Sequence, residues 1–376
     1  MVIKMSLNIR KSNKLDYIQA MRGFAAMAVV ICHLRDLFHG TPYSSFVDRW
    51  MLPGAYGVDL FFMISGFIIT YTGMNYTSHD SVKFIVKRIL RIWPPYAIWT
   101  LIYVIYFYGL NLDSYMYEKI IKSLLFIPLN FDSALYFGSA VLPPGWTLNY
   151  EMYFYLVFSI CLVFGRFRFI VMGMWFLITL LSVPYFLNLS GYKPAFIGGG
   201  YLNLMMQSLI FEFLFGVICA LIYKNGNYFL KSKFQVYPCL VLSLAIPLLA
   251  YILGVKTQDH GPANFGMFLI PSFLLIVLCG KYIEENFSIP KILTHIGDVS
   301  FSLYLCHIVV INVVYVIVSR FIDDSIHKGI ATVIITIPLA TFIASLSYKY
   351  IECNLHSFLD KLFFRFKNKN VRETAQ

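Results

Sequence analysis

The first apolar stretch of the chain, residues 15–37 (LDYIQAMRGFAAMAVVICHLRDL), carries two ionisable side chains, Arg22 and His33. Such residues are rare and costly inside a membrane, so each is a candidate functional residue. At 3.6 residues per turn the two side chains fall on nearly one helix face, about 16 Å apart along the axis. An arginine can bind an anion, and a histidine can take up a proton. Taken alone, Arg22 is also explained by snorkelling toward the inner surface.

Two carboxylates occur near the predicted outer ends of other apolar runs. Asp59 lies in GVDLFFMISGF, and Glu151 lies in GWTLNYEMYFY. We expect both at about the depth of His33, where a carboxylate would orient the imidazole and stabilise its charged form, so that His33 acts as a general base. The alternative is that each carboxylate only favours the positive end of a helix dipole. The pattern predicts a pocket formed by His33, Asp59 and Glu151.

A basic segment, KFIVKRILRIWPPYAIW, precedes the third apolar run. Arg88 and Arg91 are three residues apart, on one face of a helix, and arginine binds phosphate through paired hydrogen bonds. Together with Arg22 they predict a cationic inner end that holds the phosphates of a cytosolic ligand. A basic inner loop is also a general topology signal, so these residues are equally explained as anchors.

Two further groups are candidate substrate-binding residues. His307, in SFSLYLCHIVVINVV, is expected near the middle of the membrane, where it would line a substrate channel or simply bond to a nearby carbonyl. Trp146, Tyr150 and Tyr153 offer flat faces to a sugar ring near the outer mouth. An aromatic belt at the membrane interface accounts for them as well.

The composition predicts an all-α, polytopic integral membrane protein. Of 376 residues, 59% are hydrophobic and 13% are charged. The seven cysteines are scattered without a CxxC pair, which indicates neither a disulfide framework nor a thiolate metal site, and we expect no metal cofactor. The formal charge of +11 is concentrated between the apolar runs, so we interpret it as a topology signal and predict no nucleic-acid partner.

Ten apolar runs are long enough to span a bilayer, and Lys and Arg gather in alternate gaps between them, which predicts a bundle of about ten transmembrane helices with both termini in the cytoplasm. The runs are centred on 17–38, 54–73, 94–110, 146–164, 169–187, 203–223, 235–253, 264–280, 299–318 and 329–350. The segment 119–142 is either an eleventh span or an outer re-entrant piece, and Pro128, Asn130 and Asp132 favour the second. We expect a cytoplasmic tail at 1–14, one membrane domain at 15–356, and a basic cytoplasmic tail at 357–376.

Six motifs, taken in order, resemble the acyltransferase-3 family of bacterial inner-membrane O-acyltransferases over about residues 15–356. They are IQAMRGFAAMAVVICH, GVDLFFMISGF, KRILRIWPP, GWTLNYEMYFY, SFSLYLCH and YKYIE. The first and fourth are most similar to the branch associated with exopolysaccharide acetylation, of the succinoglycan type. The resemblance implies that Arg22 and His33 are the hallmark pair, with His33 catalytic. One departure is Glu352-Cys353-Asn354, where the family often has Glu-Arg-Pro.

We therefore expect a multi-pass enzyme of the bacterial inner membrane that transfers an acetyl group from cytosolic acetyl-CoA to a saccharide hydroxyl. The expected partners are the acyl-CoA donor, a polysaccharide or lipid-linked saccharide acceptor, and membrane lipid. His33 would act as general base or carry the acyl group covalently. The rival class is a polysaccharide or proton-coupled transporter or flippase, and a purely structural membrane partner is a third.

Overall fold

The described part of the protein is helical throughout. The computed structural model describes residues 14–129, 138–186, 201–226, 229–254, 260–262, 264, 266–359 and 361–362. Every regular element in these ranges is a helix, and none is a strand. The all-α prediction is thereby confirmed. Most of the two predicted tails lies outside the described residues, as do Asn130 and Asp132 of the segment predicted to be re-entrant.

Eight helical segments of the described ranges are long and apolar enough to cross a membrane, which makes the chain a multi-pass membrane protein. They are Asp16–Phe38, Ser44–Gly73, Ser78–Tyr108, Gly165–Ser182, Lys233–Ile252, Gly266–Asn286, Ser300–Val318 and Ser325–Leu359. The other two predicted spans coincide with the shorter helices α6 (Trp146–Leu162) and α10 (Ile210–Asn225). The total of ten and the orientation remain predictions.

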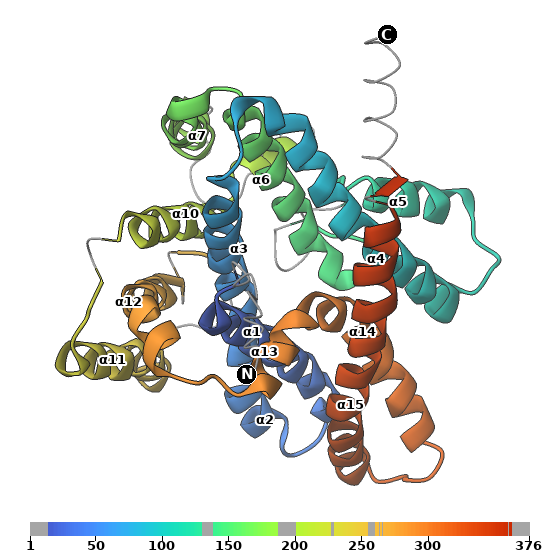
Figure 1. The fold of residues 1–376 in the computed structure, drawn as a ribbon. Helices are drawn as coiled ribbons and strands as arrows, with labels where there is room; N and C mark the ends of the chain where they lie inside the picture. The colour runs from blue at the N-terminus through green and yellow to red at the C-terminus, as the bar shows by residue number, and fades with distance from the viewer. Residues whose placement is uncertain are drawn as a thin grey trace, which may run out of the picture.

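Helix α1 (Asp16–Leu34), which carries Arg22 and His33, lies in the middle of the bundle (Figure 1). It packs against α3 (Gly57–Gly73), α12 (Gly266–Asn286), α13 (Lys291–Asp298) and α14 (Ser300–Val318). Helix α15 (Ser325–Ser347) continues into a π-helix at Tyr348–Leu355 and packs against α14. Residues far apart in the sequence can therefore surround α1.

Helix α4 (Ser81–Tyr108) begins much earlier than predicted. The sequence suggested an inner loop at 74–93 that ended at Pro94 and Pro95, but the helix runs through both prolines. It starts after a capping box in which Thr77 and Asp80 satisfy each other's backbone and side-chain groups. Prolines are tolerated inside membrane helices because neighbouring groups can satisfy the freed carbonyls. Arg88 and Arg91 consequently project from the side of a long helix and not from a loop.

Helices α3 and α10 cross unusually closely. A Cβ atom built on Gly66 would lie 2.1 Å from the backbone oxygen of Phe213, and one built on Gly216 would lie 2.0 Å from that of Met63. Neither position has room for a side chain, so glycine on both helices permits the contact. This crossing sets the orientation of α3, which carries Asp59 and Ser65.

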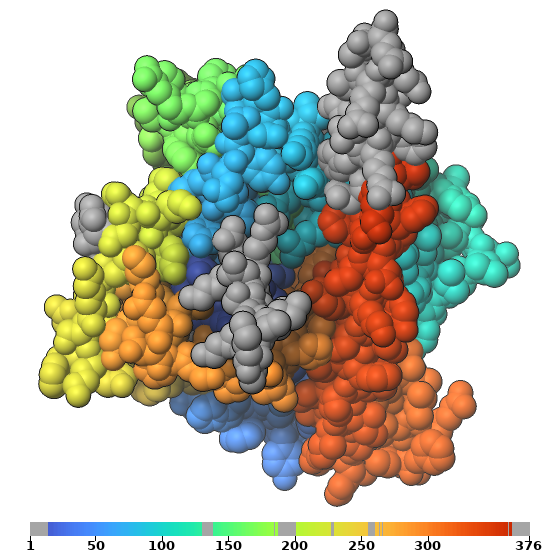
Figure 2. Space-filling model, in the orientation of Figure 1, coloured from blue at the N-terminus to red at the C-terminus, as the bar shows by residue number. Residues whose placement is uncertain are grey.

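Helices at the edge of the bundle expose apolar side chains. In the space-filling view, α10, α11 (Lys233–Ile252) and α12 form one side of the visible face, and α15 forms the opposite side (Figure 2). On α11, Leu244 is 72% exposed and Leu253, its C-cap, is 80% exposed. Such a surface suits contact with lipid.

The first residues of the 119–142 segment belong to helix α5 (Ser114–Leu124), which is too short to span a bilayer.

Candidate functional site

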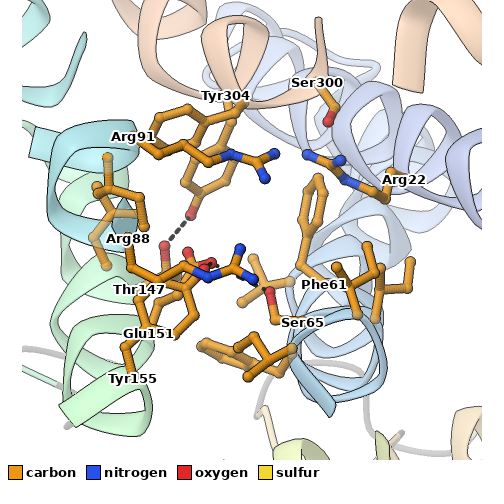
Figure 3. Close-up of a pocket in the computed structure, with 18 residues that line it drawn as sticks. Arg22, Phe61, Ser65, Arg88, Arg91, Thr147, Glu151, Tyr155, Ser300 and Tyr304 are labelled. Atoms are coloured by element: carbon orange, nitrogen blue, oxygen red, sulfur yellow. Dashed lines mark hydrogen bonds between the residues drawn. The ribbon is translucent and has the colours of Figure 1, made fainter. Parts of the chain in front are cut away.

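Three arginines from two helices meet around one cavity inside the bundle, as their common depth predicted. Arg22 comes from α1, and Arg88 and Arg91 come from α4. Figure 3 shows their guanidinium groups pointing into the same space. The remaining walls are mostly apolar and come from α3, α4, α6 and α14. Those that bear on the chemistry are Phe61, Ser65, Thr147, Glu151, Tyr155, Ser300, Phe301 and Tyr304.

Arg22 is positioned by a short polar chain on the α13 side of the cavity. Its Nη1 donates to Oε1 of Gln19 at 3.1 Å, and Nε2 of Gln19 donates to Asp298 at 2.7 Å. Lys14 also bonds to Asp298. The Asp298 charge is thus shared with Lys14 and Gln19 and does not reach Arg22 directly, which leaves most of the guanidinium donors available.

Arg88 is held by aromatic rings. Its guanidinium carbon lies 5.2 Å from the ring centroid of Phe84 and 5.4 Å from that of Tyr155. Cation–π contacts of this kind orient an arginine without neutralising it. One further bond, from Nη2 to the Thr72 hydroxyl at 3.1 Å, fixes the plane of the group.

None of these arginines forms an ion pair with another described residue. Within the ranges that the structure describes, neither Arg22, Arg88 nor Arg91 has a carboxylate oxygen within 4.0 Å, and Arg91 makes no hydrogen bond. Each guanidinium offers five donors. Several like charges in a partly desolvated cavity are costly unless an anion joins them. The cavity therefore has the chemistry of a phosphate-binding site.

Glu151 belongs to the arginine cavity. Its carboxylate accepts hydrogen bonds from the Tyr155 hydroxyl and from Ser65 Oγ, the latter at 3.4 Å. Tyr155 lies one turn further along α6. Its hydroxyl thus bonds to Glu151, and its ring makes a cation–π contact with the Arg88 guanidinium. The prediction that Glu151 shares a pocket with His33 is wrong, because Glu151 lines the arginine cavity and His33 does not.

A second cavity adjoins the first, and Arg22 and Arg91 line both. Its other polar walls are Lys14, Gln19, Tyr71, Thr72, Asp298, Tyr348, Glu352, Cys353 and His356. Oε1 of Glu352 accepts a bond from Ser302 at 2.5 Å. Glu352 and Cys353 lie in the π-helix at Tyr348–Leu355, a helix form frequently found at functional sites. The unusual end of the YKYIE motif therefore forms part of the site.

His33 and His307 face each other away from the arginine cavity. Their ring centroids are 5.1 Å apart, and neither residue lines the cavity. Two aromatic residues of the cavity wall, Phe61 and Tyr304, contact edge to face with centroids 5.8 Å apart. The Tyr304 ring also contacts His307, at 5.9 Å, and its hydroxyl lies 3.0 Å from the Thr147 hydroxyl. Tyr304 is thus a partition between the cavity and the histidine pair.

Asp59 does not orient His33, contrary to the sequence prediction. One of its oxygens lies 2.7 Å from Nδ1 of His260, and the other accepts a bond from the backbone N–H of Gly261 at 2.8 Å. Both carboxylate oxygens are thus bonded to residues of a loop, 201 and 202 positions further along the chain. Depth was predictable from the apolar run, but the face of α3 that carries Asp59 depends on the crossing with α10.

The predicted aromatic residues separate into different environments. Tyr150 is fully buried, with its ring near those of Phe62 and Trp146. Trp146 is half-buried and its ring lies 5.7 Å from that of His260. Tyr153 accepts a hydrogen bond at 2.8 Å from the indole of Trp175, which belongs to α7 (Arg168–Leu177). Of the three, Trp146 is the one with surface left for a ligand.

Sequence reasoning missed several residues that complete the site. Tyr155 and Tyr304 had a usable signal, since they lie four residues after Glu151 and three before His307 on the same helices. Ser65 lies in the GVDLFFMISGF motif, but a lone serine in an apolar run gives no functional signal. His260 had no periodic signal, because it lies in a loop.

Comparison with known proteins agrees with this arrangement. The acyltransferase-3 family model, described as an acyltransferase domain, matches residues 15–348. The exopolysaccharide production protein ExoZ of Rhizobium meliloti (strain 1021) is 32% identical over 69% of this chain and 78% of its own length. The O-acetyltransferase OatA of Staphylococcus aureus (strain NCTC 8325 / PS 47) is 26% identical over 89% of this chain and 56% of its own length. No solved structure matches.

The chain belongs to the acyltransferase-3 family and is an O-acyltransferase of the membrane. The family resemblance noted in the sequence is thus confirmed. The chain spans about half the length of the Staphylococcus relative and most of the Rhizobium relative.

Proposed function

We propose that this enzyme transfers an acetyl group from cytosolic acetyl-CoA to a hydroxyl of a cell-surface polysaccharide or its lipid-linked precursor. The acetyl group is suggested by the O-acetyltransferase relative, and the polysaccharide by the exopolysaccharide production relative. The site would lie in the bacterial inner membrane, with the N- and C-termini and the second cavity on the cytoplasmic side.

The observation that carries the proposal is a cavity that three arginines surround without forming an ion pair to any described residue. The three are Arg22, Arg88 and Arg91. CoA carries phosphates at one end and an uncharged arm at the other. Arg22 and Arg91 line both cavities, so phosphates bound at these two residues would leave the arm free to enter the part of the first cavity that has apolar walls.

In the proposed reaction, the acceptor oxygen attacks the thioester carbonyl while His33 removes the hydroxyl proton. The new C–O bond forms, the C–S bond breaks, and the proton passes to the departing thiolate, so the products are the acetyl ester and CoA. General base catalysis of this kind contributes about 10² to 10⁴ in rate. A covalent acyl-His33 intermediate gives the same net reaction.

The two carboxylates would have positioning roles. Glu151 would hold Tyr155 in place, and Tyr155 in turn would hold Arg88. Asp59 would fix the loop beside Trp146, which we propose as a sugar-binding surface.

The first test measures acetyl transfer from radiolabelled acetyl-CoA to endogenous polysaccharide in membranes. Native protein and the His33→Ala variant are compared at matched expression. We expect label in polysaccharide only with the native protein. Equal labelling by the variant would remove His33 from the chemistry. Absence of labelling by both, with polysaccharide export still dependent on the protein, would favour a transporter.

A second test follows donor binding without turnover. Cys353 is exposed and lines the second cavity, whereas the other six cysteines are buried or half-buried. CoA bound at Arg22 and Arg91 should therefore slow labelling of Cys353 by a maleimide. Cys353→Ser identifies the labelled thiol. Pantetheine, which lacks the nucleotide phosphates, should protect far less, and equal protection by both would contradict the assignment of the arginines.

A further inference from the structure

No carboxylate of the described residues forms a hydrogen bond or an ion pair with His33, and Asp36, the acidic residue one turn further along, is paired with Arg35. In the described chain, the Asp59 carboxylate is bonded to His260 and Gly261, and the Glu151 carboxylate is bonded to Tyr155 and Ser65. A histidine general base needs a fixed tautomer, which is set by the hydrogen bond at its second ring nitrogen. Another group must therefore supply that bond.

His307 has the geometry to do so. Its Nδ1 lies 2.7 Å from the backbone oxygen of Tyr304, and a carbonyl oxygen can only accept, so Nδ1 carries the proton. The remaining nitrogen, Nε2, then presents a lone pair. Nε2 is buried and has no hydrogen-bond partner among the described residues, and His307 itself is 0% exposed. A buried acceptor without a donor is costly, so this nitrogen is available for a donor that approaches it.

His33 is a possible donor whose ring contacts that of His307. The two rings have centroids 5.1 Å apart and are tilted by 43°, with His33 on α1 and His307 on α14. The two helices pack directly against each other. A small rotation of the His33 side chain would direct one of its N–H groups at Nε2 of His307, because rings at this spacing are already in contact.

We propose that His307 is the positioning residue of His33. In this arrangement, Nε2 of His307 accepts the N–H of one His33 nitrogen, and the other His33 nitrogen faces the acceptor hydroxyl as the base. When His33 takes up the hydroxyl proton, its charged form keeps the bond to His307, and the proton then leaves with the CoA thiolate. His307 binds neither the donor nor the acceptor. This inference rests on the proposed role of His33.

The alternative is that His307 only packs α14 against α1. Two variants separate the roles. His307→Leu fills the space without an acceptor, whereas His307→Gln places an amide oxygen near the position of Nε2 and can accept from His33. A packing role depends on volume, which both variants approximate. A positioning role depends on the acceptor, which the glutamine retains.

The experiment measures kcat and the acetyl-CoA KM for native protein, His33→Ala, His307→Leu and His307→Gln, with thermal stability in detergent and CoA protection of Cys353. We expect His307→Leu to lower kcat about 100-fold, within the range of general base catalysis, with unchanged KM and Cys353 protection. His307→Gln should recover at least about a tenth of native kcat. If His307→Leu does not fold, a folded His307→Gln with less than about a tenth of native kcat would still overturn the proposal.

Native-like kcat in a folded His307→Leu, or equal loss of kcat in both variants, would overturn the role of His307. If His33→Ala is inactive in that case, the proposed function stands and only this inference fails. If His33→Ala is as active as native protein, the failure lies in the proposed role of His33 itself.

Discussion

Phe61 and Tyr304 meet edge to face, with ring centroids 5.8 Å apart, at the wall that separates the arginine cavity from His307 and His33. Phe61 belongs to α3 and Tyr304 to α14. For a donor bound in the cavity as proposed, the contact would limit how far its acyl group extends toward the histidines. A short acyl group suits such a limit better than a long one.

Replacing Phe61 by alanine should therefore relax selection against longer acyl groups. Butyryl exceeds acetyl by two methylenes, each worth about 0.8 kcal/mol when buried, so the ratio of kcat/KM for butyryl-CoA to that for acetyl-CoA should rise about tenfold. Phe301→Ala is the matched control, because Phe301 lines the same cavity but has no ring contact with Tyr304 within the described residues. An equal rise in both variants would show that volume alone, and not this partition, sets acyl length.

Arg91→Ala should weaken donor binding without unfolding the protein. Arg91 makes no ion pair or hydrogen bond in the described chain, so its loss removes no native contact of that kind. Charge-assisted bonds to a phosphate are worth about 1.5 to 3 kcal/mol, which predicts an acetyl-CoA KM raised about 10- to 100-fold. Initial rates over a range of acetyl-CoA concentrations provide the measurement.

Lys83→Ala is the control for Arg91→Ala. Lys83 is a basic residue of the same helix that lines neither described cavity and lies 3.8 Å from Asp80. Its replacement should leave KM unchanged. A KM that responds equally to both substitutions would indicate a diffuse electrostatic effect and not a binding site.

Much of the fold was predictable from hydropathy, because a bilayer requires long apolar helices. The positions of Arg22, Arg88 and Arg91 along their helices were enough to predict that they would meet. The start of α4 was not predictable, since Pro94 and Pro95 are usually helix breakers in the interior of a helix. A helix inside a membrane tolerates interior prolines that would break a helix in water.

The pairing of individual side chains was much less accessible from the sequence. Depth follows from distance along a helix, but the direction of a side chain around the helix axis depends on which helices pack against it. Asp59 illustrates the difference, since its position in the first turn of α3 says nothing about His260. Local spacing would have found Tyr155 from Glu151, because residues four apart in a helix are neighbours.

Tyr155→Phe should lower activity while the ring under Arg88 remains. The substitution removes the hydroxyl that donates to Glu151 and preserves the aromatic face 5.4 Å from the Arg88 guanidinium. A hydrogen bond to a charged group contributes about 1.5 to 3 kcal/mol, so kcat/KM should fall by about 10- to 100-fold. A double-mutant cycle with Glu151→Gln measures the coupling. Additive losses would mean that the two residues act independently.

Gly66→Ala should destabilise the bundle at the crossing of α3 and α10. The added methyl would lie 2.1 Å from the Phe213 backbone oxygen, and the helices would have to separate to admit it. Overpacking of this kind costs about 1 to 3 kcal/mol, so thermal unfolding in detergent should occur at a lower temperature. Gly173→Ala on α7 is the control, since a Cβ there meets nothing within 4 Å and alanine favours the helix. Because α3 also carries Asp59, Phe61 and Ser65, separation of the helices should reduce acetyl transfer even in the fraction that stays folded. Unchanged stability of Gly66→Ala would contradict the close crossing on which the orientation of α3 depends.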